Sequence, residues 1–138
     1  MTTALTTGPV LVFDGDCAFC TTSVLWLQRR FPDGFAVVPY QRTDLELLGL
    51  TEAQCNSRVQ WIADVQAPRT SRHESGARAV GALLRAGGRS RGGVAGSLWA
   101  AVGVLPFVPP TSWAAEAVYR VVAANRQRLP GGTPACAA

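Results

Sequence analysis

The segment from residue 10 to residue 40 constrains the fold most strongly. It begins with the apolar run VLVF, which is typical of a buried strand, and the following DG dipeptide favours a turn. A helix is expected to start at Asp16 or Cys17 and to end at Arg30, where FPDG gives a stop signal. The apolar FAVVPY then reads as a second strand. These features predict a right-handed β-α-β unit with two parallel strands.

Two cysteines, Cys17 and Cys20, lie where the strand turns into the helix. At a helix start the unpaired amides and the helix dipole stabilise a thiolate, so Cys17 is expected to be the exposed, more reactive thiol. Cys20, shielded by the next turn, is close enough to attack a mixed disulfide formed at Cys17. Asp16 could cap the helix, although a carboxylate near Cys17 also raises the pKa of that thiol. Asp14 could assist proton transfer to Cys20 or shape the turn.

Metal binding and purely structural thiols are the alternatives to a redox pair. A zinc site would have to recruit Cys55, His73 or Cys136 from unrelated segments, and none of them has a usual paired spacing. Cys55 is expected to pack as a small apolar residue, and Cys136 to be a bystander in the C-terminal tail. His73 is expected to have a surface or capping role.

The sequence resembles the thiol-disulfide oxidoreductase DCC family, whose DxxCxxC signature matches Asp14, Cys17 and Cys20. The segment AVYRVVAANRQRL near the C-terminus is also similar to this family. The resemblance implies a thioredoxin-like fold and a redox activity with Cys17 and Cys20 as active thiols. In one respect the chain departs from thioredoxin-type enzymes, which place a substrate-binding proline before the strand that faces the CxxC. Ser57 and Arg58 stand there instead, so the usual presentation of a substrate disulfide is not carried over.

The remaining elements are predicted from local patterns. Short helical turns are expected at 43–46 and 51–54, which have the form of capping boxes. A half-buried strand is expected within 58–66 and a fourth strand near 70–73. A helix containing Ala79 to Leu84 is expected to close at Gly87 and Gly88, with GGRSRGG as a loop, and Ser112 is expected to cap the last helix. All four tryptophans are expected in the core.

Residues 94–115 carry no charge, which raises the possibility of a membrane span. Pro106, Pro109 and Pro110 interrupt this run, and each proline removes a backbone donor and clashes with the preceding helical turn. We therefore expect two packed helices joined by a turn and no transmembrane span.

Composition and length indicate one globular domain. The chain has 138 residues and is 48% hydrophobic, enough for a single core. We expect a thioredoxin-like domain over 9–130, with flexible ends at 1–8 and 131–138. The net charge is +4, and all basic residues are arginines. The densest group, 69–91, has no interleaved aromatics, which argues against nucleic-acid binding.

The sequence therefore predicts an α/β protein with a thioredoxin-like β-α-β core and additional C-terminal helices, acting as a thiol-disulfide oxidoreductase without a cofactor. The start of the chain has neither the basic nor the apolar region of an export signal, so a cytoplasmic location is expected. Its partners would be a disulfide-containing protein or a small-molecule thiol, and an external reductant. The alternatives are a non-catalytic partner-binding or redox-sensing module and, less favoured, a zinc-binding protein.

Overall fold

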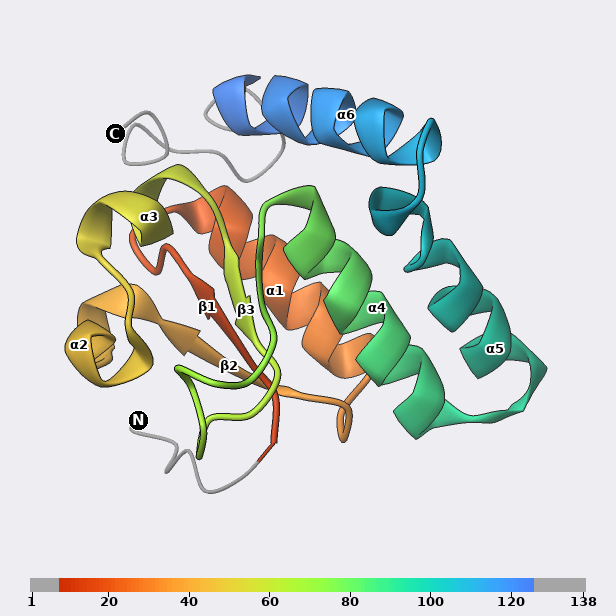
Figure 1. Cartoon of the computed structure of the whole chain (residues 1–138), viewed down its shortest axis with the longest axis horizontal. Coiled ribbons are helices and arrows are strands. Elements are labelled where there is room, and N and C mark those ends of the chain that lie inside the picture. Colours follow the sequence, from red (N-terminus) through yellow and green to blue (C-terminus); the bar gives the residue numbers. More distant parts are fainter. Residues whose placement is uncertain (1–7, 126–138) are drawn as a thin grey trace.

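The computed structural model describes residues 8–125, which form a four-stranded sheet with helices on both faces (Figure 1). The first three elements are the predicted β-α-β unit: β1 (Val10–Phe13), α1 (Ala18–Arg30) and β2 (Ala36–Pro39). β1 and β2 are parallel, with Val10 opposite Ala36. The predicted β-α-β unit is thus confirmed, whereas residues 1–7 and 131–138, within the ends predicted to be flexible, lie outside the described part of the chain.

Two further strands complete the sheet: β3 (Gln60–Ile62) and β4 (His73–Ser75). Both neighbouring pairs, β1 with β3 and β3 with β4, are antiparallel, and the strand order is β2-β1-β3-β4. A β-α-β unit is therefore followed by a β-β-α unit, which ends in the long helix α4 (Ala77–Arg91). This is the α/β, thioredoxin-like arrangement that the sequence predicts.

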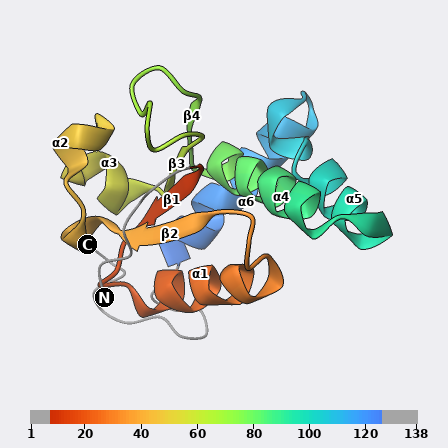
Figure 2. The same ribbon diagram turned by 90° about the horizontal axis from the view of Figure 1, so that it is seen from below.

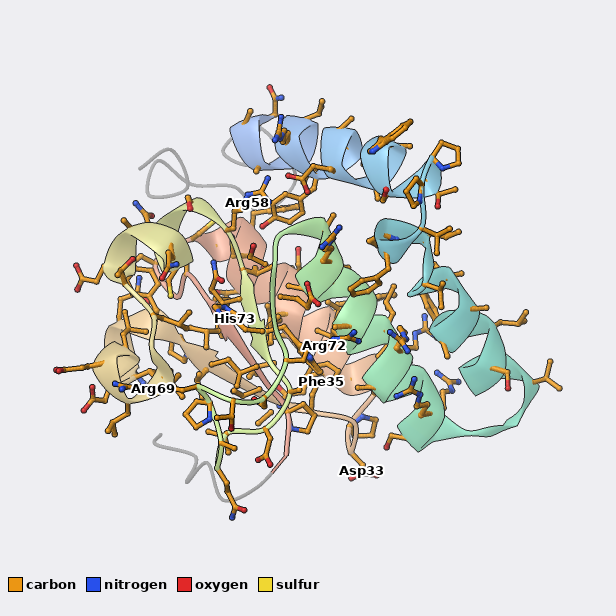
Figure 3. The ribbon with its side chains drawn as sticks, viewed as in Figure 1. Asp33, Phe35, Arg58, Arg69, Arg72 and His73 are labelled. Carbon is orange, nitrogen blue, oxygen red and sulfur yellow. The ribbon has the colours of Figure 1, made fainter. Side chains whose placement is uncertain are left out.

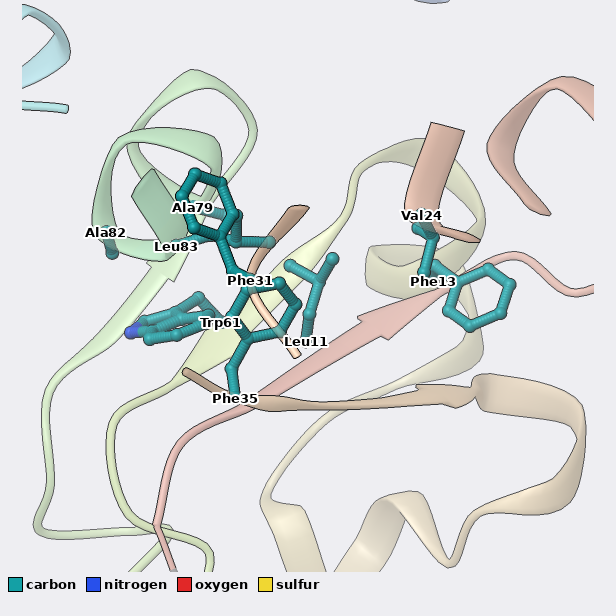
Figure 4. Close-up of a cluster of buried hydrophobic side chains, with 9 residues drawn as sticks. All are labelled: Leu11, Phe13, Val24, Phe31, Phe35, Trp61, Ala79, Ala82 and Leu83. Atoms are coloured by element: carbon teal, nitrogen blue, oxygen red, sulfur yellow. The ribbon is translucent and has the colours of Figure 1, made fainter. Parts of the chain in front are cut away.

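Apolar side chains of β1 alternate between the two faces of the sheet. Leu11 and Phe13 join a cluster with residues of α1 and α4, which Figure 4 shows in close-up. Val10 and Val12 join a second cluster on the opposite face, with Leu48 among its members. Figure 2 shows α1 on one side of the sheet and α2 (Leu45–Leu48) and α3 (Glu52–Ser57) on the other. A strand covered on both faces is apolar at every position, which explains the uninterrupted run VLVF.

The prediction of a half-buried strand within 58–66 is wrong in its burial pattern. All three residues of β3 are buried, including the polar Gln60. Both faces of β3 are covered, because Trp61 packs into the cluster with α1 and α4, and Ile62 packs into the cluster with Leu48 on the opposite face. The amide of Gln60 is satisfied by the carbonyls of Gln54 and Arg58 and by the ring of His73.

The short helices after β2 largely follow their capping signals. Thr51 and Gln54 form the predicted capping box of α3. α2 begins one residue later than its pattern suggests, because Asp44, and not Thr43, accepts the capping hydrogen bond. Thr43 instead ends the 3₁₀ turn η1 (Tyr40–Arg42) and donates its hydroxyl to Pro39 O.

The predicted end of the helix at Gly87 and Gly88 is wrong, because α4 continues through both residues to Arg91. A β-carbon at Gly87 would overlap the ring of Phe31 in α1, and one at Gly88 would overlap Gly96. These glycines therefore serve close helix packing and do not end the helix. The left-handed backbone occurs only afterwards, at Gly92, so the predicted loop reduces to the junction between two helices.

The uncharged run 94–115 folds as expected into helices broken by prolines: α5 (Gly93–Val102), the 3₁₀ turn η2 (Leu105–Phe107) and the start of α6 (Thr111–Asn125). α5 packs closely against α4. α6 has no fully buried residue and contacts mainly η2, so it is packed less tightly than expected. Ser112 lies inside α6, which begins one residue earlier, so its predicted capping role is wrong.

No single helix among residues 8–125 is long and apolar enough to cross a membrane. Two consecutive segments, Gly93–Phe107 and Thr111–Asn125, pass this test of length and composition only when they are taken together. Their axes are bent by 90° relative to each other.

The four tryptophans do not all lie in the core. Trp61 is buried and Trp99 packs against the cluster shown in Figure 4, whereas Trp26 is 47% and Trp113 is 71% exposed. Trp26 meets Trp99 edge-on at a centroid distance of 6.5 Å and lies under the guanidinium of Arg30. Among the described residues, no ring or guanidinium makes a comparable contact with Trp113 at the start of α6.

Candidate active site

Cys17 is the N-cap residue of α1, directly after the turn that ends β1. Its backbone is extended, and its Sγ accepts a hydrogen bond from the backbone N–H of Cys20 at 3.4 Å. The sulfur therefore occupies the position usually taken by a serine or aspartate oxygen, facing the amides of the first helical turn. An acceptor in this position is stabilised further when it is negatively charged.

The exposure of the two cysteines is the reverse of what the sequence suggests. Cys17 has a relative exposure of 0%, whereas Cys20 is partly buried. Cys20 lies one turn into α1 and packs against the apolar cluster between α1 and α4. Position on the helix predicts where the amides point, but the surrounding chain determines which sulfur is covered.

Asp14 is almost completely buried and organises the turn before Cys17. Its Oδ1 accepts hydrogen bonds from the backbone N–H of Asp16 at 3.0 Å and from the Gln41 side-chain amide at 2.8 Å. The same Gln41 amide accepts from the N–H of Gly15 at 2.9 Å. Asp16 is exposed and does not cap α1. Of the two roles considered for Asp14, the observed contacts are those of turn shaping.

Gln41 is a site residue that the sequence analysis missed. It lies in η1, and the parallel pairing of β1 and β2 brings the ends of these strands together, so that its amide reaches the Asp14 turn. A β-carbon at Gly15 would overlap Pro39, so the close approach of the two segments also requires glycine at that position. One feature of the sequence could have indicated Gln41: it follows the second of two predicted parallel strands, and the residues that follow such strands meet at one edge of the sheet.

An apolar cavity of about 630 Å³ lies beside Cys20, between α1, α4, η2 and α6. Asp14 and Cys20 form part of its wall together with Leu105 and Val118. Its lining is almost entirely apolar. A space of this size and character can hold an apolar group of a substrate next to the CxxC motif.

α6 covers the loop before β3, where thioredoxin-type enzymes have a proline. Arg58 forms an ion pair with Glu116 and lies over the ring of Tyr119, and Figure 3 shows Arg58 next to α6. The Tyr119 hydroxyl accepts a hydrogen bond from the N–H of Val59 at 3.1 Å. The carbonyl of Val59 accepts from the N–H of Gly76. Both backbone groups of Val59 are therefore engaged within the chain.

The other two candidate residues that the structure describes, Cys55 and His73, make contacts that belong to the fold. Cys55 is 2% exposed in the cluster under α2 and α3, and burial raises the pKa of its thiol to about 11, which confirms the expected packing role. His73 lies in β4, exposed, with its Nε2 2.9 Å from Gln60 Oε1. Within residues 8–125, no three His, Cys, Asp or Glu side chains gather as metal ligands. Cys136 lies outside the described residues.

Comparison with known proteins connects this geometry to a family. Residues 11–132 match the family model of the DCC1-like thiol-disulfide oxidoreductases, which covers most of the chain. The chain belongs to this family. The match to DCC1-like thiol-disulfide oxidoreductases includes α5, η2 and α6 as well as the thioredoxin-like core, so the C-terminal elements that line the apolar cavity, η2 and α6, are part of the family unit. No curated protein and no solved structure matches the chain significantly.

Proposed function

We propose that this protein is a thiol-disulfide oxidoreductase that works through Cys17 as the attacking thiol and Cys20 as the resolving thiol. The observation that carries the proposal is the hydrogen bond from the Cys20 N–H to Cys17 Sγ at the N-cap of α1. Cys17 is disulfide-bonded in this structure, and once it is reduced this contact favours negative charge on its sulfur. Family membership supports the same chemistry.

The reaction consists of two exchanges. The Cys17 thiolate attacks one sulfur of a substrate disulfide, forms a mixed disulfide and releases the other substrate sulfur as a thiolate, which takes up a proton. The Cys20 thiolate then attacks the Cys17 sulfur, forms the Cys17–Cys20 disulfide and releases the second substrate thiol. The substrate gains two electrons, and the two cysteines lose them. An external dithiol or two thiol molecules return the pair to its reduced form.

Asp14 is a positioning residue in this scheme. Its contacts with the Asp16 N–H and the Gln41 amide hold the turn that places Cys17 at the N-cap. The apolar wall beside Cys20 favours substrates with apolar groups next to the disulfide. We propose a disulfide-containing protein or a small-molecule disulfide as substrate, and the cytosol as location, where the thiol pool supplies the reductant.

Trapping experiments test the division of labour. The Cys20→Ser and Cys17→Ser proteins are exposed briefly to oxidised glutathione at neutral pH and examined by intact-mass and peptide mass spectrometry. Cys20→Ser is expected to accumulate a glutathione adduct on Cys17, because the resolving thiol is missing, whereas Cys17→Ser accumulates little. Cys55→Ser and Cys136→Ser are the matched controls, and both should still form the Cys17–Cys20 disulfide.

One observation favours the reverse order of attack. Cys20, and not Cys17, lines the apolar cavity, and it is less buried than Cys17. If Cys17→Ser traps the adduct as readily as Cys20→Ser does, Cys20 is the attacking thiol. If oxidation pairs Cys17 with Cys136, the resolving role of Cys20 fails. If folded protein forms neither adduct nor disulfide, a non-catalytic binding module replaces the oxidoreductase.

A further inference from the structure

The outer side of α5, η2 and the start of α6 exposes large apolar side chains. We call this surface the apolar face, defined by Val94, Leu98, Val102, Leu105, Val108 and Trp113, whose side chains are between 46% and 79% exposed. In Figure 1 these elements lie at the edge of the molecule away from α2 and α3. Apolar surface concentrated in this way is typical of an interaction site.

The spacing on α5 shows that this surface is not left over from core packing. Val94, Leu98 and Val102 are four residues apart, so they form one stripe along the helix. The opposite side of α5 packs on α4 through the buried Gly96 and the partly buried Trp99. α5 is therefore apolar on both sides, although only one side packs against another element among residues 8–125.

The charge of the chain is distributed unevenly and favours an anionic partner. Residues 1–74 contain six arginines and eight acidic residues, a net charge of −2, whereas residues 75–138 contain seven arginines and one glutamate, a net charge of +6. Arg89 and Arg91 are exposed at the end of α4, next to the start of α5, and Arg120 is 74% exposed on α6. The one glutamate, Glu116, is paired with Arg58 and Arg120.

We propose that the apolar face docks onto the surface of an anionic lipid bilayer. The apolar side chains would enter the boundary between head groups and acyl chains, and the arginines would contact the head groups, as in amphipathic peripheral helices. Trp113, at the edge of the face, has the side chain that is enriched at this boundary. Leu105 belongs both to the apolar face and to the cavity beside Cys20, so docking would bring the candidate active site to the membrane.

Vesicle flotation tests this proposal on the full chain. Vesicles of phosphatidylcholine alone are compared with vesicles that also contain phosphatidylglycerol, at low and high salt. Arg89 and Arg91 should each contribute about 1 kcal/mol to the free energy of binding to an anionic surface. The chain is therefore expected to bind the anionic vesicles at least about tenfold more tightly than the neutral ones, and less tightly at high salt. The double variant Leu98→Glu, Trp113→Glu is expected to lose this binding.

Matched variants separate docking from general effects. Leu47→Glu changes a leucine that is 69% exposed on α2, and it should bind vesicles as the unmodified chain does. Arg89→Gln with Arg91→Gln should reduce only the preference for anionic vesicles. Circular dichroism confirms that each variant is folded. The proposal is overturned if the unmodified chain does not float with anionic vesicles, or if Leu47→Glu is as damaging as the double variant. It also fails if light scattering shows a dimer that the double variant dissociates, because a second copy then covers the face.

Discussion

Gly88 in α4 and Gly96 in α5 face each other so closely that a β-carbon on either residue would overlap the carbonyl oxygen of the other. Gly81 and Gly103 repeat this relationship seven residues away along each helix, where a β-carbon at Gly81 would lie 2.6 Å from Gly103 O. The two helices therefore approach along a line of glycines, which positions η2 and α6 against the thioredoxin-like core.

Gly88→Ala should destabilise the protein although alanine is the better helix former. The gain in helix propensity is about 1 kcal/mol, but the methyl group has only backbone atoms of α5 to displace, and overpacking of this kind costs about 1–3 kcal/mol. We expect a net loss in the free energy of unfolding, measured by urea denaturation. Ser90→Ala, exposed on the same helix, is the control and should be neutral or slightly stabilising. Equal stability of the two variants would mean that the helices can separate without cost.

Replacement of Asp14 distinguishes turn shaping from proton transfer. Asp14→Asn keeps an oxygen that can accept from the Asp16 N–H and the Gln41 amide, so the exchange rate should stay close to that of the unmodified protein. Asp14→Ala removes both contacts and should slow exchange about tenfold or more through misplacement of Cys17. Rates of reduction of a model disulfide check this. A loss in Asp14→Asn equal to that in Asp14→Ala would instead identify Asp14 as a proton-transfer group.

Cys55 should make stability depend on pH in the alkaline range. Burial raises its pKa from 9.0 to about 11 in the folded protein, so between these values the folded state binds more protons than the unfolded state. The free energy of unfolding should therefore be unaffected by this group below about pH 9 and fall as the pH rises to about 11, by at most about 1.4 kcal/mol per pH unit. Burial also raises the pKa of Tyr40, so the slope must be compared with that of Cys55→Ala. An unchanged slope in that variant would contradict the assignment.

Tyr119→Phe tests the attachment of α6 to the loop before β3. Loss of the hydroxyl removes the acceptor of the Val59 N–H, which should cost about 1 kcal/mol of unfolding free energy. Amide hydrogen exchange at Val59 should become faster than at neighbouring residues. Tyr40→Phe, at the other tyrosine of the chain, is the control and should leave the exchange at Val59 unchanged. If Tyr119→Phe does not alter that exchange, the Tyr119 hydroxyl does not attach α6 to this loop.

Local patterns determined the first half of the fold and the position of the redox motif. An apolar run, a turn and a helix stop lie close together in the sequence, so β1, α1 and β2 could be predicted together with the place of Cys17 and Cys20 at the start of α1. The proline cluster likewise predicted the break between α5 and α6. These signals depend on backbone chemistry within a few residues, and for this reason they can be read without the tertiary structure.

Only the tertiary structure decided what each element faces. Gly88 looks like a helix stop in the sequence, but the backbone of α5 occupies the space of its missing side chain. Gln41 reaches the Asp14 turn because parallel pairing brings the ends of two strands together. Exposure of Trp113, and burial of Cys17 rather than Cys20, follow from which segments cover them. Burial and side-chain contacts depend on residues far apart in the chain, so short-range patterns in the sequence could not determine them.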